Sequence, residues 1–577
     1  MLKTLLAQVR EFKKASFLTP FFMILEVLFE TLIPLAMASI IDKGVEAGNI
    51  GHIYRMGAVM VALALCGLWS GVMGGKYGAL ASTGFARNLR KAMYTNIQTF
   101  SFSNIDKYST AGLITRLTTD VTNLQNAYQM ILRMCTRAPA SLICAMVMAF
   151  LINAKLASIY LVAVIFLGGC LIFIMRKATV YFQAVFRKYD DLNASVQENI
   201  GAVRVVKAYV REDYEISKFQ KACNKVYEMF LSAEKIVVMN MPLMQFTVYA
   251  CILGISWLGA KMIVGSSLTT GELMSLLTYC MNILMSLMML SMVFVMVTMS
   301  IASAERVTEV INDTADITDP EDPVTDVPDG SIVFDHVNFS YKKDSQEPVL
   351  KDINLSIRSG ETIGIIGGTG SAKSSLVNLI PRFYDATEGR VEIMGRDVRS
   401  YPREALRGKV AVVMQKAQLF GGTIRSNLLW GRKNASDEEL WQALETAQAA
   451  EFVRAKPLGL DEPVEQGGRN LSGGQKQRLT IARALVGRPE ILILDDSASA
   501  LDYATDAALR KALAALPGSL TVFIVSQRAA SLQHADQILV LDDGHLVGIG
   551  THDQLRQTCP VYEEIYESQF KKGDAQK

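Results

Sequence analysis

A glycine-rich segment lies between a short apolar run and a helical run in the C-terminal half of the sequence. It reads Gly367-Gly368-Thr369-Gly370-Ser371-Ala372-Lys373-Ser374-Ser375. Glycines let successive backbone N–H groups face a phosphate, and the start of the following helix adds positive potential. In such a loop Lys373 reaches the terminal phosphates and the Ser374 hydroxyl binds Mg²⁺. Because strand, loop and helix follow in the required order, the segment predicts a phosphate-binding loop rather than a chance turn.

Two further segments carry groups that suit phosphate chemistry. The apolar run Ile491 to Leu494 ends in Asp495 and Asp496, which places carboxylates at the end of a strand, beside the position of a phosphate-bound metal. The run Leu471-Ser472-Gly473-Gly474-Gln475 precedes a helical segment, and its adjacent glycines can form a second backbone nest for an anion. Loop and acidic strand together predict a nucleoside triphosphatase core.

The elements that would position these segments are short β-rich runs alternating with helical runs. The β-rich runs are Ile363 to Ile366, Val410 to Val413, Ile491 to Leu494 and Thr521 to Val525. This alternation predicts an α/β domain with a largely parallel sheet, which we expect over residues 331–570. Residues 312–330 are rich in Asp, Pro and Thr, cannot continue a helix and are interpreted as a linker. Residues 571–577 have the composition of a polar tail.

Residues 1–311 differ in composition from the rest of the chain. They hold about six apolar runs, each of about 20 residues or more and therefore long enough to cross a bilayer. These runs lie near Phe17 to Ile41, Tyr54 to Ala79, Leu132 to Ile152, Leu156 to Ile174, Met241 to Val264 and Leu273 to Ile301. The connections at about 80–131 and 175–240 contain few Gly or Pro residues, so we expect the spanning helices to continue outside the bilayer.

Positive charge indicates the orientation of the membrane domain. Both long connections are rich in Lys and Arg, and the N-terminus carries Lys3, Arg10, Lys13 and Lys14. Because cytoplasmic loops are enriched in these residues, we expect both termini and the α/β domain in the cytoplasm of a multi-pass protein of the cytoplasmic membrane. The polar breaks at Tyr108 to Gly112 and Val210 to Asp213 are candidate docking surfaces at the tips of the two connections.

The composition of the whole chain excludes several classes of protein. Of its 577 residues, 50% are hydrophobic and 20% are charged, which does not suit a wholly soluble or disordered protein. The formal net charge of +2 gives no support for nucleic-acid binding. The 8 cysteines include no CxxC pair, which argues against a disulfide framework or a zinc site.

The first and last spans contain candidate cargo contacts. Glu26 and Glu30 lie one helical turn apart, and carboxylates within a membrane normally face the interior of the helix bundle. They either attract cationic cargo or pair with polar or basic groups of a partner chain. In the last span, the flexible thioethers of Met285, Met289 and Met292 suit a cavity for varied apolar ligands. Packing or lipid contact is the simpler explanation of these methionines, because methionines cover every face of that helix.

The order of the three motifs resembles that of the ATP-binding cassette (ABC) proteins, whose signature is the LSGGQ run at residues 471–475. The resemblance covers essentially the whole chain, which is similar to one half of an ABC exporter of the multidrug-resistance type. It implies that Tyr341 stacks on the adenine of ATP, that Gln415 contacts Mg²⁺ and the γ-phosphate, and that Asp502 lies in a loop that crosses to a second nucleotide site. It also implies a small hydrophobic, amphipathic or peptide substrate.

The candidate site residues fall into two sets, the contacts to ATP and the ligands of the metal. The implied ATP contacts are Tyr341, Gly367, Thr369, Gly370, Ser371, Ala372, Lys373, Ser374, Ser375 and Asp502. The implied metal ligands are Ser374, Gln415 and Asp495.

Three positions depart from the pattern of the family. Asp496 stands where active cassettes carry Glu, Gln527 stands where they carry His, and Ala372 replaces the third glycine of the phosphate loop. A carboxylate that positions the attacking water must lie within hydrogen-bond reach of it, and a misplacement of about 1 Å can cost on the order of a hundredfold in rate. Gln527 can donate a hydrogen bond but cannot carry a positive charge. We therefore expect this site to bind ATP and to hydrolyse it slowly.

In this family two cassettes pack head to tail, and each ATP lies between the phosphate loop of one and the signature of the other. The altered Asp496 and Gln527 affect the site built on this chain's phosphate loop, whereas the signature serves the opposite site. The resemblance therefore implies the degenerate-site subunit of a heterodimeric exporter. A homodimer with two slow sites, an importer built on the exporter fold, and a nucleotide-gated channel or regulator remain as alternatives.

Overall fold

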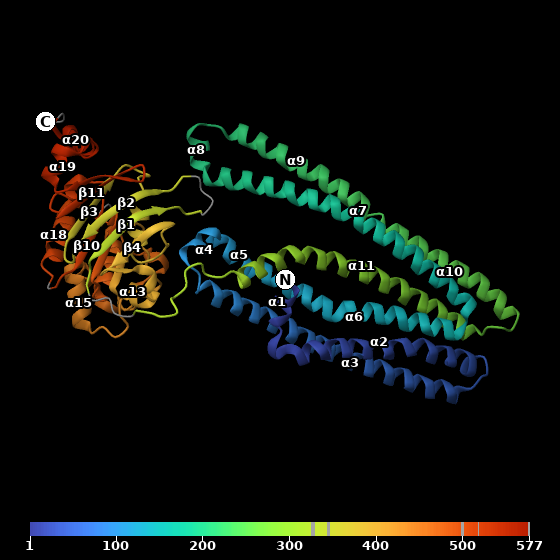
Figure 1. Cartoon of the computed structure of the whole chain (residues 1–577). Helices are drawn as coiled ribbons and strands as arrows, with labels where there is room; N and C mark the ends of the chain where they lie inside the picture. Colours follow the sequence, from blue (N-terminus) through green and yellow to red (C-terminus); the bar gives the residue numbers. More distant parts are fainter. Residues whose placement is uncertain (325–328, 343–346, 498–500, 517, 575–577) are drawn as a thin grey trace. The chain divides into compact units, whose positions relative to one another are not determined.

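The structure is a computed structural model of the chain, and it describes residues 1–324, 329–342, 347–497, 501–516 and 518–574 (Figure 1). Parts of the expected linker and tail, residues 325–328 and 575–577, lie outside the described residues. The chain divides into two compact units. One comprises Met1–Thr99 and Ser109–Thr314, and the other comprises Phe100–Tyr108 and Ala315–Lys577. The second unit therefore includes a short segment from the N-terminal half of the sequence.

The first unit is built from long helices. Six helical segments among the described residues are long and apolar enough to cross a membrane, which confirms the predicted number of spans. They are Arg10–Val45, Ile50–Ile97, Thr110–Ile152, Ala154–Ala178, Glu212–Val264 and Thr270–Asn312. The main helices of these segments are α2 (Lys13–Ile40), α3 (Ile50–Ile97), α6 (Val121–Ile152), α7 (Ala154–Gly201), α10 (Asn240–Val264) and α11 (Thr270–Asn312).

Several helices are much longer than a bilayer requires. Helices α3 and α7 have 48 residues each, which corresponds to about 72 Å at a rise of 1.5 Å per residue, against a hydrocarbon core of about 30 Å. Helix α9 (Glu212–Val237) leads into α10 and packs along α7. The spanning helices therefore do continue past the bilayer. The break at Val210 falls between α8 (Val203–Ala208) and α9.

The first break lies beside a helix that belongs to the second unit. Helix α4 (Phe102–Lys107) ends just before Tyr108, and α5 (Thr110–Thr115) follows in the first unit. The side chain of Ser109 accepts a hydrogen bond from the backbone N–H of Gly112 and caps the start of α5. The predicted docking tip is therefore the point at which the chain passes from one compact unit to the other.

Buried tyrosines tie helices of the first unit together. The Tyr160 hydroxyl of α7 donates to the carbonyl oxygen of Leu276 on α11 at 2.7 Å. The Tyr279 hydroxyl of α11 donates to the carbonyl oxygen of Thr31 on α2 at 2.7 Å. Both rings are fully buried, so their hydroxyls need partners inside the protein.

The second unit contains a six-stranded sheet and a four-stranded antiparallel sheet. The larger sheet has the order β12-β11-β3-β10-β9-β6, and all neighbours in it are parallel except β11 and β12. Its strands are β3 (Thr362–Gly367), β6 (Val410–Val413), β9 (Ile491–Asp495), β10 (Thr521–Val525), β11 (Gln537–Asp542) and β12 (His545–Gly550). The smaller sheet has the order β2-β1-β4-β5, formed by β1 (Ile332–Phe339), β2 (Leu350–Ile357), β4 (Glu388–Ile393) and β5 (Arg396–Asp397). The predicted α/β unit with a largely parallel sheet is confirmed.

The central strands are buried along most of their length because their sequences are almost wholly apolar. Strand β10 is buried at every position, and β3 and β9 at all but one. This pattern is typical of parallel strands that are covered on both faces. Because neighbouring parallel strands end at the same edge, the segments that follow β3, β9 and β10 come together there.

Candidate functional site

A cavity of about 300 Å³ lies at the edge where β3, β9 and β10 end. It brings together residues that are far apart in the sequence: the phosphate loop, the end of β9, the segment after β6 and the segment after β10. The cavity is lined by Val349, Thr369, Gly370, Ala372, Lys373, Ser374, Ser375, Gln415, Asp495, Asp496, Val525, Ser526 and Gln527. Most of the residues predicted to contact the phosphates and the metal therefore share one site.

The phosphate loop contains an unusual backbone conformation. Ala372, at the start of α12 (Lys373–Leu379), has φ +70° and ψ +23°, in the left-handed region that favours glycine. Gly370 also has a positive φ, +87°. Only glycine visits this region without steric cost, and other residues pay roughly 1 kcal/mol or more. The loop therefore keeps a glycine-type turn although the residue is alanine.

Lys373 folds back onto the loop that carries it. Its Nζ donates to the carbonyl oxygens of Gly367 at 2.9 Å and Gly368 at 2.6 Å. Burial lowers the pKa of this lysine, although the nearby Asp496 and Asp495 carboxylates act in the opposite direction. Its ammonium group is thus held by backbone carbonyls at the point where the phosphates of a nucleotide are predicted to bind.

Ser374 and Asp495 form a pair of oxygen ligands. The Ser374 hydroxyl donates to Oδ1 of Asp495 at 3.0 Å. Burial raises the pKa of Asp495, and the adjacent Asp496 carboxylate adds to this shift. A cation at this position would favour the ionised carboxylate. A hydroxyl and a carboxylate beside a phosphate-binding loop fit Mg²⁺, which binds through one or two carboxylates together with substrate phosphates.

The three positions that depart from the family pattern, Ala372, Asp496 and Gln527, all line the cavity. Oδ2 of Asp496 accepts a hydrogen bond from Nε2 of Gln415 at 3.1 Å. The backbone of Gln527 is held by the C-terminal helix α20 (Pro560–Asp574), because Nε2 of Gln569 donates to the carbonyl oxygen of Gln527 at 2.8 Å. At the two catalytic positions the cavity thus holds a short carboxylate, bonded to Gln415, and a neutral amide.

The other predicted site residues lie outside the cavity. Ser472 and Asp502 are exposed and cap the starts of α17 (Gly473–Val486) and α18 (Tyr503–Ala514), where they accept hydrogen bonds from backbone N–H groups. Backbone and side-chain hydrogen bonds from Thr505 lower the pKa of Asp502. The signature motif therefore does not complete the phosphate site of its own chain.

Tyr341 lies beside the phosphate loop and does not line the cavity. Its hydroxyl and the Ser375 hydroxyl are 2.8 Å apart, within hydrogen-bond distance. The residue is 47% exposed, which leaves surface for stacking. Its edge-to-face neighbours are Phe339 and Tyr384, with ring centroids at 4.8 and 5.1 Å.

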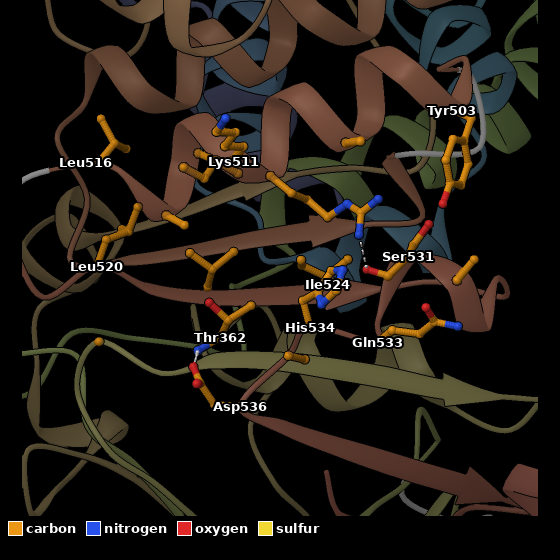
Figure 2. Close-up of a pocket in the computed structure, with 18 of the residues that line it drawn as sticks. Thr362, Tyr503, Lys511, Leu516, Leu520, Ile524, Ser531, Gln533, His534 and Asp536 are labelled. Carbon is orange, nitrogen blue, oxygen red and sulfur yellow. Dashed lines mark hydrogen bonds between the residues drawn. The ribbon is translucent and has the colours of Figure 1, made fainter. Parts of the chain in front are cut away.

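A larger cavity of about 530 Å³ lies between α18, β10 and residues 530–536 (Figure 2). The backbone N–H of Thr362 donates to Oδ2 of Asp536 at 2.8 Å, and Nη1 of Arg510 donates to the carbonyl oxygen of Ser531 at 3.2 Å. None of the predicted nucleotide or metal ligands lines this cavity. Its size alone therefore does not make it the nucleotide site.

The two membrane carboxylates are paired within the chain. Nη1 of Arg137 on α6 donates to Oε1 of Glu26 at 3.0 Å, and Nη2 of the same residue donates to Oε2 of Glu30 at 3.0 Å. Helix α3 approaches this group closely, because a Cβ atom on Gly71 would lie 3.1 Å from Oε1 of Glu26. A basic residue of this chain thus makes the pairing that one of the two hypotheses assigned to a partner chain.

The candidate methionines of α11 have different environments. Met285 and Met292 are 60% and 61% exposed, whereas Met289 is half-buried. Met285 and Met292 therefore lie on the surface of the first unit, and their contact with cargo stays a prediction.

Comparison with known proteins identifies the family. Residues 16–304 match the family described as ABC transporter transmembrane region, and residues 350–499 match the family described as ABC transporter. The chain belongs to the ABC transporters. Both halves of the expected architecture are thereby accounted for, the six membrane helices by the first match and the ATP-binding unit by the second.

Related ABC transporters match along most of the chain. The uncharacterized ABC transporter ATP-binding protein YfiB of Bacillus subtilis (strain 168) is 37% identical over 97% of this chain and 98% of its own length. The ATP-dependent lipid A-core flippase of Desulfotalea psychrophila (strain LSv54 / DSM 12343) is 32% identical over 84% of both chains. The structure of a bacterial Atm1-family ABC exporter with ATP bound has a TM-score of 0.78 and 25% identity, covering 95% of this chain and 97% of that one.

These matches define the activity at the level of the family. The chain is an ATPase-coupled transporter of the exporter type, with an ATP-binding unit and a multi-pass membrane region. Sequence reasoning missed two residues near the site, Gln569 and Tyr384, and in the membrane it missed Arg137. No local motif marks these residues, because each acts through a contact with a distant part of the sequence.

Proposed function

We propose that this ABC transporter chain is the degenerate-site half of a heterodimeric exporter, which moves an amphipathic or hydrophobic substrate outward across the cytoplasmic membrane. The observation that carries the proposal is that Asp496 and Gln527, the two departures at catalytic positions, line the same cavity as the phosphate loop. Asp496 is hydrogen-bonded to Gln415, and its side chain is one methylene shorter than that of Glu. The site therefore lacks both the Glu and the His that active cassettes carry at these two positions.

Within this proposal each cassette contributes to two sites. Ser374, Asp495 and Gln415 bind Mg²⁺ at the slow site, Lys373 binds the terminal phosphates and Tyr341 stacks on adenine. The exposed Ser472 and Gly473 serve the site of the partner chain. Their position outside this chain's own cavity supports that division of roles.

The membrane part of the proposal concerns orientation and cargo. Residues 1–311 form the membrane domain, residues 331–570 form the nucleotide-binding domain, and both termini lie in the cytoplasm, in keeping with the Lys and Arg residues of the long connections. The exposed Met285 and Met292 suit an apolar cargo. The relative that is a lipid A-core flippase supports a substrate with a lipid-like part.

Transport energy enters through nucleotide binding. A closed pair of cassettes binds ATP more tightly than an open pair, so ATP shifts the population towards the closed state, and hydrolysis removes that preference. A slow site holds its ATP through many cycles. The partner's site, completed by the signature of this chain, sets the rate of cycling.

The nature of the nucleotide trapped on this chain tests the proposal. We expect photoaffinity labelling with azido-ATP during steady turnover to leave mainly ATP on this chain and mainly ADP on its partner. Lys373→Ala should weaken binding to this chain, because it removes a charge-assisted contact of about 1.5 to 3 kcal/mol, while turnover at the partner's site continues. Mainly ADP on this chain would show that its own site hydrolyses ATP and would overturn the proposal.

A further inference from the structure

Helix α4 is held in the second unit by the turn that carries Phe383 and Tyr384. The rings of Phe102 and Phe383 are stacked, with centroids 4.2 Å apart. The Tyr384 hydroxyl donates a hydrogen bond to Oδ2 of Asp106 at 2.5 Å. One face of α4 thus rests on two neighbouring aromatic residues of the nucleotide-binding unit.

The same tyrosine contacts the predicted adenine platform. The ring of Tyr384 meets that of Tyr341 edge to face, at 5.1 Å and an interplanar angle of 88°. Tyr341 in turn lies within hydrogen-bond distance of Ser375 at the phosphate loop. Tyr384 therefore touches both α4 and the residue predicted to stack on the nucleotide base.

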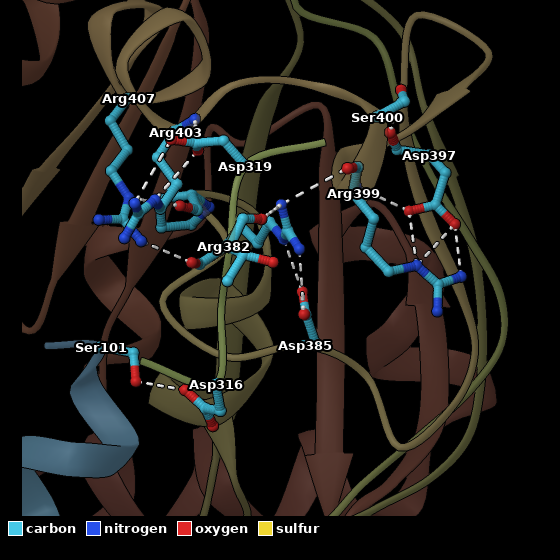
Figure 3. A network of polar contacts seen from close by, with 12 residues as sticks. Ser101, Asp316, Asp319, Arg382, Asp385, Asp397, Arg399, Ser400, Arg403 and Arg407 are labelled. Carbon is cyan, nitrogen blue, oxygen red and sulfur yellow. Dashed lines mark hydrogen bonds and ion pairs between the residues drawn. The ribbon is translucent and has the colours of Figure 1, made fainter. Parts of the chain in front are cut away.

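The turn that carries Tyr384 is fixed in place (Figure 3). Arg382 is 5% exposed and forms an ion pair with Asp385 at 2.8 Å. Nη2 of Arg407 donates to the carbonyl oxygen of Arg382 at 2.7 Å. These contacts hold the backbone on either side of Tyr384, so the turn keeps the Tyr384 hydroxyl within reach of Asp106.

A second attachment of the same segment does not involve the aromatic residues. Asp316 accepts hydrogen bonds from the Ser101 hydroxyl and, at 2.6 Å, from the Ser103 hydroxyl (Figure 3). This contact anchors residues 101–103 to the segment that follows α11. It provides an internal comparison, because it holds the segment through hydrogen bonds from Ser101 and Ser103 and acts on Tyr384 only through the charge of Asp316.

We propose that Tyr384 is a positioning residue that couples stacking of the nucleotide base on Tyr341 to the position of α4. The inference rests on the proposed function, because it assumes that Tyr341 stacks on adenine. It gives the ATP of the slow site a regulatory role that does not require its hydrolysis. When a base occupies Tyr341, the edge-to-face contact fixes the Tyr384 ring, and the hydrogen bond to Asp106 then holds α4.

The chemistry of the hydrogen bond suits this role. A phenol that donates to a carboxylate makes a short, charge-assisted bond, which is stronger than one between neutral groups. Burial, followed by the hydrogen bond to Asp106, raises the pKa of Tyr384, so its hydroxyl remains a donor at neutral pH. Helix α4 is continuous in sequence with α5 and the spanning helix α6, so its restraint bears on the membrane helices.

Hydrogen exchange of residues 100–108 in the purified full chain tests the inference without knowledge of the cargo. ATP is added with a chelator of divalent cations, so binding is observed without hydrolysis, and CTP serves as a probe with a smaller, more weakly stacking base. We expect ATP to slow exchange in this segment about tenfold and CTP at most about twofold. Binding of each nucleotide is measured separately by displacement of TNP-ATP.

Three single variants distinguish coupling from simple attachment. Tyr384→Phe keeps the ring and loses the hydroxyl, so we expect normal ATP affinity but loss of most of the ATP-induced protection. Asp106→Asn should have the same effect, and the two changes together should add nothing further. Asp316→Asn should raise exchange of the segment in the absence of nucleotide yet keep the difference between ATP and CTP.

The outcomes separate this inference from the proposed function. If Tyr384→Phe retains the ATP-induced protection to within twofold, or if Asp316→Asn abolishes it equally, Tyr384 has no positioning role. Equal protection by ATP and CTP would show that base stacking does not reach α4. These results leave the trapped-nucleotide experiment unaffected, because that experiment reports hydrolysis and not the position of α4.

Discussion

At the scale of residues, the candidate site combines a phosphate loop that has alanine in place of its third glycine with altered catalytic positions. The local order of strand, loop and helix makes the loop predictable from sequence, because each of its groups acts through a backbone geometry that nearby residues determine. The hydrogen bond between Gln415 and Asp496 is different, because it joins segments after β6 and β9 that meet only in the folded sheet. The left-handed conformation of Ala372 was not predicted, because alanine, unlike the glycine usual at this position, disfavours it.

The altered positions can be tested by restoring the family residues. Asp496→Glu with Gln527→His should raise hydrolysis at this site, because a longer carboxylate reaches the attacking water and an imidazole can carry a charge beside the γ-phosphate. We expect a partial gain, about tenfold, if the partner's signature is itself altered. The measurement is the ratio of ADP to ATP trapped on this chain, with Asp496→Asn plus Gln527→His as the matched control. A ratio that does not differ between the two double variants would show that residue 496 does not limit hydrolysis.

At the scale of elements, the six spans and the parallel sheet follow from properties that are local in sequence. Helix length and the apolar runs of β3, β9 and β10 are such properties, and all of them were predicted. The pairing of Arg137 with Glu26 and Glu30 was not, because it depends on how α2 and α6 are aligned along their axes. The assignment of α4 to the second unit was also missed, since it depends on the contacts of Phe102 and Asp106 with distant residues.

The pairing of α2 with α6 leads to a prediction about stability. Arg137→Gln leaves two carboxylates one helical turn apart without the cation that pairs with both, so the free energy of unfolding should fall by about 1 to 3 kcal/mol, less than for a fully buried pair. Adding Glu26→Gln and Glu30→Gln should restore most of the loss. Thermal denaturation of the purified chain in detergent measures both effects. If the triple variant is no more stable than Arg137→Gln, the ion pairs do not hold the two helices together.

The same variants address the role of these carboxylates in cargo binding. If Glu26 and Glu30 attracted cationic cargo, Glu26→Gln with Glu30→Gln would weaken stimulation of ATPase activity by cationic compounds and spare neutral ones. Because Arg137 already neutralises part of their charge, we expect equal effects on both classes of compound. A selective loss for cations would favour cargo attraction over the structural role.

At the scale of the whole molecule, the family membership and the exporter fold are established, whereas the division of labour between two chains is proposed. Sequence reasoning reached the family because the motifs of the ATP-binding unit and the six spans occur in one chain in a fixed order. It could not reach the partner, because the residues of a second chain are not encoded here. What this chain does carry is an asymmetry, altered catalytic positions beside an unaltered signature at residues 471–475.

The most direct test of this division is the ATPase activity of the affinity-tagged chain purified from its own membranes, compared with that of the same chain produced alone. The proposal predicts that a second ABC chain co-purifies and that the pair hydrolyses ATP at least tenfold faster than the chain alone. Replacing Ser472 with a bulky residue should remove most of the activity of the pair, because Ser472 acts on the partner's site across the interface. If the chain alone forms a dimer that hydrolyses ATP as fast as the purified pair, it is not a degenerate half and the division of labour is wrong.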